Sequence, residues 1–233
     1  MSSVLALYNA LVARGTHPAL TWYGPDGRME LSGKVAANHL AKIAGYLADE
    51  VWLDEGAQLQ LDLPSHWKTC LWGLGAMLAG LNVTVTERAV TDSPPGGAQN
   101  APSSAVLTNR PESAPAADNT IALDLGPLAL AWTGAPLPPG VFDGSSEVLG
   151  SPDQLMDTSR HSSGNFNDWE TRGTLTPAGD RLLISGEAAA NPSSTLAAVA
   201  WQLGRGSVVV VQNEQNPSRV ADTEGATLAL PSR

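Results

Sequence analysis

The chain has 233 residues, 42% of them hydrophobic, which suffices for one substantial core or for two small ones that share a sheet. A net charge of −10 and an isoelectric point near 4.7 argue against nucleic acid or an anionic membrane as a partner, since both need basic patches. One cysteine excludes a disulfide framework, and no signal peptide or membrane-spanning stretch is recognisable, so we expect a soluble cytoplasmic protein.

The first 56 residues predict a helix, a β-hairpin and a second helix. Val4–Val12 is a short amphipathic stretch. Leu20–Tyr23 and Arg28–Leu31 flank the turn-forming tetrapeptide Gly24–Gly27, a pattern typical of a hairpin. Ser32 then begins a longer helix, whose inward face carries Ala36, Leu40, Ile43, Leu47 and Val51 and whose outward face carries Lys34, Asn38, Lys42 and Asp49.

The next segment has the pattern of a strand, a helix and a strand. Leu59–Leu63 alternates apolar and polar residues, Pro64 ends that strand, and Ser65 is the expected cap of the following helix. Gly80 is the expected end of this helix, because glycine tolerates the left-handed conformation. Val83–Val85 resumes as a strand. This length and order predict a parallel βαβ unit.

The middle of the chain is less regular. Residues 86–104 and 134–176 are rich in proline, glycine and serine, and the short strands Ala105–Thr108 and Thr120–Leu125 lie between them. Loops of this length are functional or mobile, and we expect flexible loops in both places. Trp169 lies in the second of them and is the one tryptophan expected to be exposed.

A second unit of the same kind follows. Arg181–Ser185 predicts a strand, Ser193 or Ser194 caps a helix that ends at Gly204, and the β-branched run Val208–Val211 predicts a strand buried on both faces. Asn216 and Pro217 begin a short helix, and Ala226–Leu230 is the expected last strand. The repeated alternation predicts one α/β domain over residues 1–233, with a layered, mostly parallel sheet flanked by helices and Val208–Val211 at its centre.

Several of these segments resemble one family. The run PALTWYGPDGRMELSGKVAANHLAKIAGYLADEVWLDEGAQLQLDLPSHWK, continuing through GAMLAGLNVTV, resembles the start of the AMP-forming acyl-CoA synthetases and other adenylate-forming enzymes. Residues 175–213 resemble a later segment of the same family. The resemblance implies the fold of the N-terminal subdomain of these enzymes. It also suggests a smaller group of truncated, stand-alone, uncharacterised AMP-binding-like proteins of actinobacteria.

The residues that perform the chemistry of this family are not matched. The family's spacing puts its phosphate loop near residues 143–152. There Gly144, Ser145 and Ser146 match the loop motif only weakly, and Glu147 would repel a triphosphate. The sequence has no lysine after Lys68. The family's ribose-binding aspartate and C-terminal lysine belong to motifs beyond the last residue. Whether the protein is an enzyme therefore stays open, although the missing residues favour a protein without catalysis. We assign no cofactor, and ATP and AMP are the nucleotides whose binding should be tested.

Other kinds of site are not predicted. The four histidines show no metal-ligand spacing, and His39 and His66 are expected on a helix surface or as caps. Cys70 has no partner base in the pattern and is expected in the core. We therefore assign no catalytic residue and no metal ligand.

Two classes of function remain. The first is a non-catalytic protein that binds a ligand or regulates a partner. The second is a weak nucleotide- or acyl-adenylate-binding enzyme, or a half-enzyme that completes its site with another chain. We also expect a homodimer or a protein partner to cover the side that later segments cover in the family, because exposed apolar patches and sheet edges favour association. The alternative is that the loops of residues 134–176 fold over this side and keep the protein monomeric.

Overall fold

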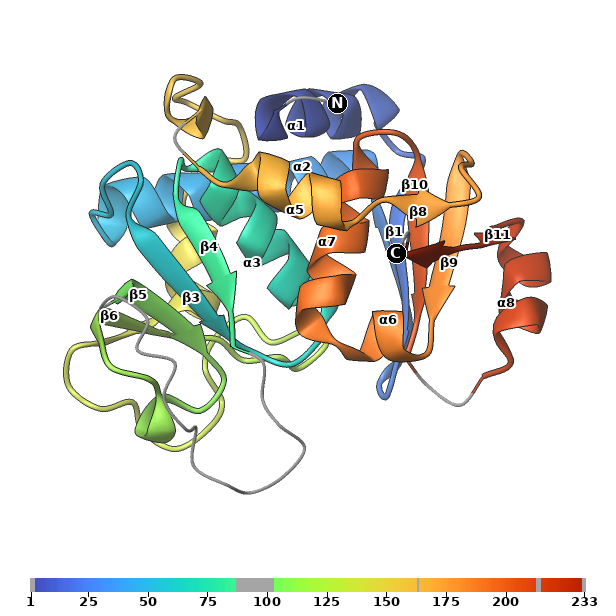
Figure 1. The fold of residues 1–233 in the computed structure, drawn as a ribbon. Coiled ribbons are helices and arrows are strands. Elements are labelled where there is room, and N and C mark those ends of the chain that lie inside the picture. Colours follow the sequence, from blue (N-terminus) through green and yellow to red (C-terminus); the bar gives the residue numbers. More distant parts are fainter. Residues whose placement is uncertain (1–2, 87–102, 163, 213–214, 232–233) are drawn as a thin grey trace.

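The computed structural model describes residues 3–86, 103–162, 164–212 and 215–231. Most of the predicted loop 86–104 lies outside these ranges. Figure 1 shows two sheets on opposite sides of the molecule, with helices between them and around them. The predicted α/β class with mostly parallel strands is confirmed, but the prediction of one sheet is wrong, because the described strands form two sheets of five strands and a small sheet of two.

The first sheet contains the hairpin and the second βαβ unit. Its strand order is β11-β9-β10-β1-β2, in which β1 and β2 are antiparallel and the other pairs are parallel. β10 lies in the middle and is buried along its whole length, as predicted. The bounds are β1 Pro18–Gly24, β2 Gly27–Ser32, β9 Arg181–Ser185, β10 Ser207–Val211 and β11 Thr227–Leu228.

The second sheet contains the first βαβ unit and the strands that follow it. Its order is β4-β3-β5-β6-β7, and every pair is parallel. The two βαβ units each close as predicted, yet they never pair with one another. The bounds are β3 Gln58–Asp62, β4 Asn82–Val85, β5 Ser103–Thr108, β6 Ala117–Ala122 and β7 Val141–Asp143.

The helices connect and cover these sheets. The helices longer than one turn are α1 Val4–Arg14, α2 Gly33–Gly45, α3 Trp67–Leu78, α5 Phe166–Arg172, α7 Pro192–Leu203 and α8 Pro217–Glu224. Shorter pieces are the π-helical turn Tyr46–Glu50, α4 Gly144–Glu147, α6 Glu187–Ala190, and 3₁₀ turns at Pro111–Ser113, Val148–Gly150 and Arg160–Ser162. No helix of the described ranges combines the length and apolar character needed to cross a bilayer.

Helix α3 lies at the centre of the molecule, between the two sheets (Figure 1). All twelve of its residues are buried. Two glycines allow this close packing: a Cβ on Gly73 would lie 2.9 Å from Leu196 of α7, and one on Gly75 would lie 2.6 Å from Ile43 of α2. A layer of helices between the sheets thus joins both halves of the chain into one main hydrophobic cluster.

Two predicted helix caps are wrong by one to three residues. His66, not Ser65, caps α3, and the Ser65 hydroxyl instead donates to the carbonyl of Ala189. Asn191 caps α7 and accepts from the Ser194 N–H, with Pro192 as the first helical residue. In both places the side chain that reaches the free N–H groups is decided by the direction in which the chain enters the helix.

The segment 134–176 contains more structure than a flexible loop would have. It includes β7, α4, α5 and the two-residue strand β8 (Leu175–Thr176). Trp169 was expected to be exposed, and this is wrong: it is 4% exposed and its indole N–H donates to the carbonyl of Val83. Asn165 also bonds to the main chain of Val83, so α5 is held against the free edge of β4.

The last predicted strand is divided. β11 (Thr227–Leu228) pairs with β9, whereas β12 (Leu230–Pro231) turns away and pairs with β8. Buried Ala229 lies between the two short strands. The uninterrupted strand Ala226–Leu230 is therefore corrected to two short strands in different sheets.

Candidate functional site

A cavity of about 400 Å³ opens between α2, α3, β2 and residues 123–153. Its wall is mostly apolar, with Leu31, Leu71 and Trp72 among the lining residues. The polar groups that reach it are few and come mainly from the two helices. An apolar cavity with a few convergent polar groups is the usual form of a small-molecule site.

Helical spacing explains how α2 forms one wall. Val35, Asn38, His39 and Lys42 recur at i, i+3, i+4 and i+7, so they form one stripe on the helix. The opposite stripe of α2 is buried against α1 and α3. On α3, Trp67, Lys68, Leu71 and Trp72 line the same cavity.

Two of the three lysines in this acidic chain line the cavity. Lys68 is 8% exposed, and its Nζ donates to the carbonyl oxygens of Asp124 (2.7 Å) and Gly126 (2.9 Å). No carboxylate oxygen of the described residues lies within 4 Å of this ammonium. Burial lowers the pKa of Lys68, and the charge of Asp124 opposes that shift only in part.

Lys42 adds a second ammonium group to the same wall, and His39 lies beside it. Lys42 Nζ donates to the carbonyl of Leu149 (3.0 Å) and pairs with the exposed Asp153 (2.9 Å). Burial first, and then the charges of Lys68 and Lys42, lower the pKa of His39. The His39 ring packs edge-on against Trp67, with 5.9 Å between ring centroids. A neutral imidazole beside two ammonium groups favours an anionic group of a ligand at this end.

The residues predicted at the position of a phosphate loop also lie at this cavity. Gly144 and Ser145 line it, and Ser146 follows in the single turn of α4. The N–H groups of Ser145 and Ser146 both donate to the Asp143 carboxylate, at 3.0 and 3.3 Å. The Ser145 hydroxyl accepts from the N–H of Asp124. The N–H groups that a phosphate would need are therefore already bonded, next to a carboxylate.

Glu147 and Gly144 have packing roles in the same turn. The Glu147 carboxylate accepts from the Tyr46 hydroxyl (2.9 Å), and burial and this bond raise the pKa of that phenol. A Cβ on Gly144 would lie 2.6 Å from Ile121 of β6. This glycine is explained by close packing against the sheet.

Sequence reasoning missed the lysines and His39 as site residues. It treated Lys42 as an outward-facing residue, His39 as a surface or capping residue, and Lys68 only as the last lysine. The signal that the sequence offered was the concentration of lysine, a rare residue type in this acidic chain, in one part of the sequence. Elsewhere, Cys70 is buried and burial raises the pKa of its thiol, so a thiolate is disfavoured there. Within the described ranges, no three His, Cys, Asp or Glu side chains gather as metal ligands do.

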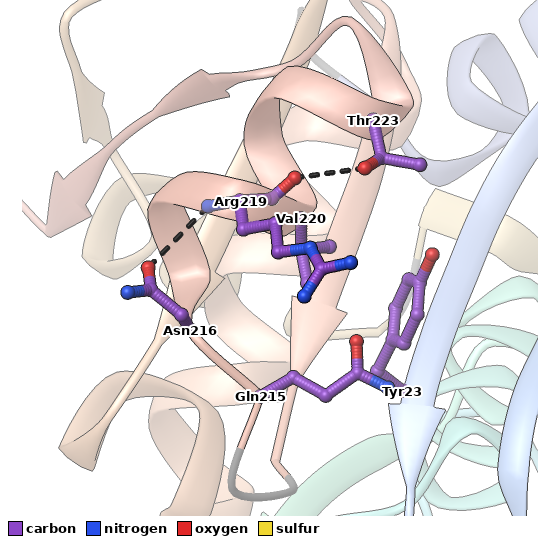
Figure 2. A pocket seen from close by; sticks show the side chains of 6 residues that line it. All are labelled: Tyr23, Gln215, Asn216, Arg219, Val220 and Thr223. Carbon is purple, nitrogen blue, oxygen red and sulfur yellow. Dashed lines mark hydrogen bonds between the residues drawn. The ribbon is translucent and has the colours of Figure 1, made fainter.

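A second cavity, of about 380 Å³, lies between β1 and α8. Figure 2 shows its lining: Tyr23 faces Gln215, Asn216, Arg219, Val220 and Thr223, and the Arg219 side chain extends from the helix toward the tyrosine side. The Asn216 carboxamide accepts from the Arg219 N–H, and the Thr223 hydroxyl donates to the Arg219 carbonyl. Its polar groups therefore mainly stabilise α8 itself.

Comparison with known proteins identifies the fold. No protein-family model matches the sequence, and no curated protein matches it either. An acyl-CoA synthetase from Brucella canis matches 96% of this chain and 46% of its own, with a TM-score of 0.65 and 15% identity. An acetoacetyl-CoA synthetase from Streptomyces lividans matches 96% and 41%, with a TM-score of 0.68 and 14% identity.

A third match is NpsA from Klebsiella oxytoca, in complex with 3-hydroxyanthranilyl-AMSN. It covers 98% of this chain and 47% of its own, with a TM-score of 0.60 and 12% identity. The fold expected from the resemblance to adenylate-forming enzymes is thus confirmed. The chain spans less than half of the length of these three structures.

Proposed function

We propose that this protein binds a small apolar molecule with an anionic group in the cavity between α2 and α3, and that it does not activate this ligand with ATP. The observation that carries the proposal is the pair of lysines at an apolar cavity. Lys68 in particular is buried, its Nζ donates to two carbonyl oxygens, and within the described ranges no carboxylate pairs with it directly. A ligand anion would supply the missing counter-charge.

A carboxylate is the anion that fits best with the fold. The matched structures are named as acyl-CoA and acetoacetyl-CoA synthetases, and another, from Pectobacterium brasiliense, as a coronafacic acid ligase. These names refer to acyl groups and to a carboxylic acid. An acyl or aryl carboxylate would place its apolar part against Leu71 and Trp72, and its charge near Lys42 and Lys68.

A role without catalysis is favoured by the residues around Ser145. Adenylate formation stabilises developing phosphate charge with positioned cations and free N–H groups, and losing one such group costs on the order of 100-fold in rate. Here the N–H groups of Ser145 and Ser146 donate to Asp143, and Glu147 adds a second carboxylate. These contacts support binding, or regulation of a partner through binding, over the alternative of a weak enzyme or half-enzyme.

Calorimetry with a series of carboxylates tests the binding site. We expect octanoate or phenylacetate to bind, and the corresponding amides to bind at least tenfold more weakly, since about 1.4 kcal/mol corresponds to that factor. Lys42→Gln should weaken the carboxylates, whereas Lys34→Gln on the exposed side of the same helix should not. Val35→Trp should fill the cavity, with Val12→Trp on α1 as the matched control. Equal binding of acids and amides would overturn the proposal.

Pyrophosphate release tests the absence of catalysis. With ATP, magnesium and the same carboxylates, we expect no release above background. Release that is lost in a Ser145→Ala, Ser146→Ala double variant would instead support the alternative, a weak adenylating enzyme. A stabilising shift with AMP alone would favour a nucleotide-binding protein.

A further inference from the structure

Exposed apolar side chains gather at the mouth of the proposed binding cavity. Of the nine large apolar residues that are exposed in the described ranges, four line this cavity: Val35, Leu128, Leu130 and Leu149. Leu128 and Leu130 are 89% and 68% exposed, so they lie at its rim. A concentration of exposed apolar surface usually marks a binding surface. Because this rim is continuous with the cavity, the ligand of the cavity is the molecule that it is placed to meet.

Both leucines belong to segment 127–131, which has the sequence Pro-Leu-Ala-Leu-Ala and lies outside the helices and strands. Its first four residues all line the cavity. Among the described residues, the main chain of this segment makes one main-chain hydrogen bond, from the N–H of Ala129 to the carbonyl of Gly126 (3.3 Å). The middle of the segment therefore moves at the cost of few contacts.

The two ends of this segment, in contrast, are fixed. The Asp124 carboxylate accepts from the N–H of Gly126 (2.8 Å) at the first end, and from the N–H of Thr133 (3.0 Å) and its hydroxyl at the second. Lys68 Nζ donates to the carbonyls of Asp124 and Gly126, so the first end is also tied to α3 at the cavity wall. An apolar segment with fixed ends and few contacts in its middle is built as lids are built.

We propose that segment 127–131 is a lid that closes over the apolar part of the bound carboxylate, and that Leu128 and Leu130 select ligands whose chain reaches the rim of the cavity. A long chain that extends past the cavity removes apolar surface of both leucines from water, and this burial stabilises the closed lid. A short ligand that stays within the cavity leaves both leucines exposed. The inference rests on the function proposed above and refines it by the chain length of the ligand.

Calorimetry with a long and a short carboxylate tests this selection. A Leu128→Ser, Leu130→Ser double variant, which changes only exposed side chains, should bind dodecanoate at least tenfold more weakly, because the complex loses the buried surface of two leucines. Its affinity for phenylacetate should equal that of the wild type. The matched control is Val12→Ser, Met156→Ser, at two exposed apolar residues outside the cavity, and it should change neither affinity. Equal weakening of both ligands, or of neither, would overturn the lid.

NMR shows whether the two leucines meet the ligand. Their methyl signals are assigned by their loss in Leu128→Ala and Leu130→Ala. At saturation we expect nuclear Overhauser contacts between these methyl groups and the last methylene groups of dodecanoate, and no such contacts with phenylacetate. Bound dodecanoate without these contacts would contradict the proposal.

Dodecanol separates this inference from the proposed function, because it has the same chain and no charge. Lys42→Gln should weaken dodecanoate and leave dodecanol unchanged, whereas the double leucine variant should weaken both by about the same factor. Equal affinity of the wild type for dodecanol and dodecanoate would exclude the anion site, and weaker dodecanol binding by the leucine variant would still support the lid. A leucine variant that loses self-association but keeps its affinity for dodecanol would assign the leucines to a protein contact and overturn the lid.

Discussion

Single ionisable side chains hold distant parts of this chain together. The Glu224 carboxylate, 8% exposed, accepts from the Tyr23 hydroxyl, from Arg28 Nε (2.8 Å) and from Arg181 Nη2 (2.6 Å). These partners lie on β1, β2 and β9, so one side chain of α8 bonds to three strands of the first sheet. The hydrogen bond from Arg28 is the largest cause that lowers the pKa of Glu224, to about 2.

Glu224→Gln should therefore destabilise the protein by about 2 kcal/mol, because a hydrogen-bonded charge is lost and two arginines remain. Asp222→Asn, on an exposed position of the same helix, should change stability little. The depressed pKa also sets the pH range: the contribution of Glu224 is present above about pH 4.5 and is lost as the pH falls toward 2. Urea unfolding at pH 7 and pH 3 measures both effects, and a Gln variant as stable as the wild type would contradict them.

His66 should make stability depend on pH in a higher range. Its pKa is lowered from 6.5 to about 4, so between these values the unfolded chain binds a proton that the folded chain does not. Stability should thus be greatest above pH 6.5 and should fall as the pH drops toward 4, with His39 acting in the same direction. NMR titration of the His66 ring tests this. A midpoint near 6.5 in the folded protein would exclude it.

At the scale of elements, glycines set how closely the helices pack. Gly173 ends α5 with an ordinary backbone conformation, yet a Cβ there would lie 1.8 Å from the carbonyl oxygen of Ala197 in α7. This contact involves main-chain atoms, which cannot rotate away. The position therefore requires glycine because of packing between the two helices. The apolar periodicity of either helix does not predict this requirement.

Gly173→Ala should accordingly cost about 3 kcal/mol or more, since the two helices must separate. Gly150→Ala is the matched control: its Cβ would meet no atom within 4 Å, and its backbone is not left-handed. This control should be neutral or slightly stabilising. Thermal unfolding of the two variants decides the matter, and equal melting temperatures would show that α5 moves freely against α7.

At the scale of the molecule, the edge of the first sheet at β11 is a surface suited to association. β11 is one of the two edge strands of this sheet. Leu228 in β11 is 44% exposed, and Leu230 in the neighbouring β12 is 67% exposed. Exposed apolar residues on a strand edge favour pairing. We propose that this side forms a homodimer or receives another protein chain.

Light scattering over a dilution series measures this association. We expect a dimer at high concentration that Leu228→Lys converts to a monomer, because a charge on the edge strand opposes pairing. Leu128→Lys, at an exposed leucine beside the binding cavity, should leave the dimer intact. A monomer at every concentration, with no partner recovered from the native cell, would rule the proposal out.

The sequence alone determined the fold class and many of the elements, but not those of residues 134–176 or the division of the last strand. Arg181–Ser185 was predicted with its observed bounds, and the hairpin and the buried run Val208–Val211 were also correct, because apolar periodicity, caps and turn residues are local properties. Only the tertiary structure decided that the two βαβ units lie in separate five-stranded sheets, that Trp169 is buried, and that Lys42, Lys68 and His39 meet at one cavity. These features depend on contacts between residues far apart in the chain, and no local pattern specifies which distant surfaces meet.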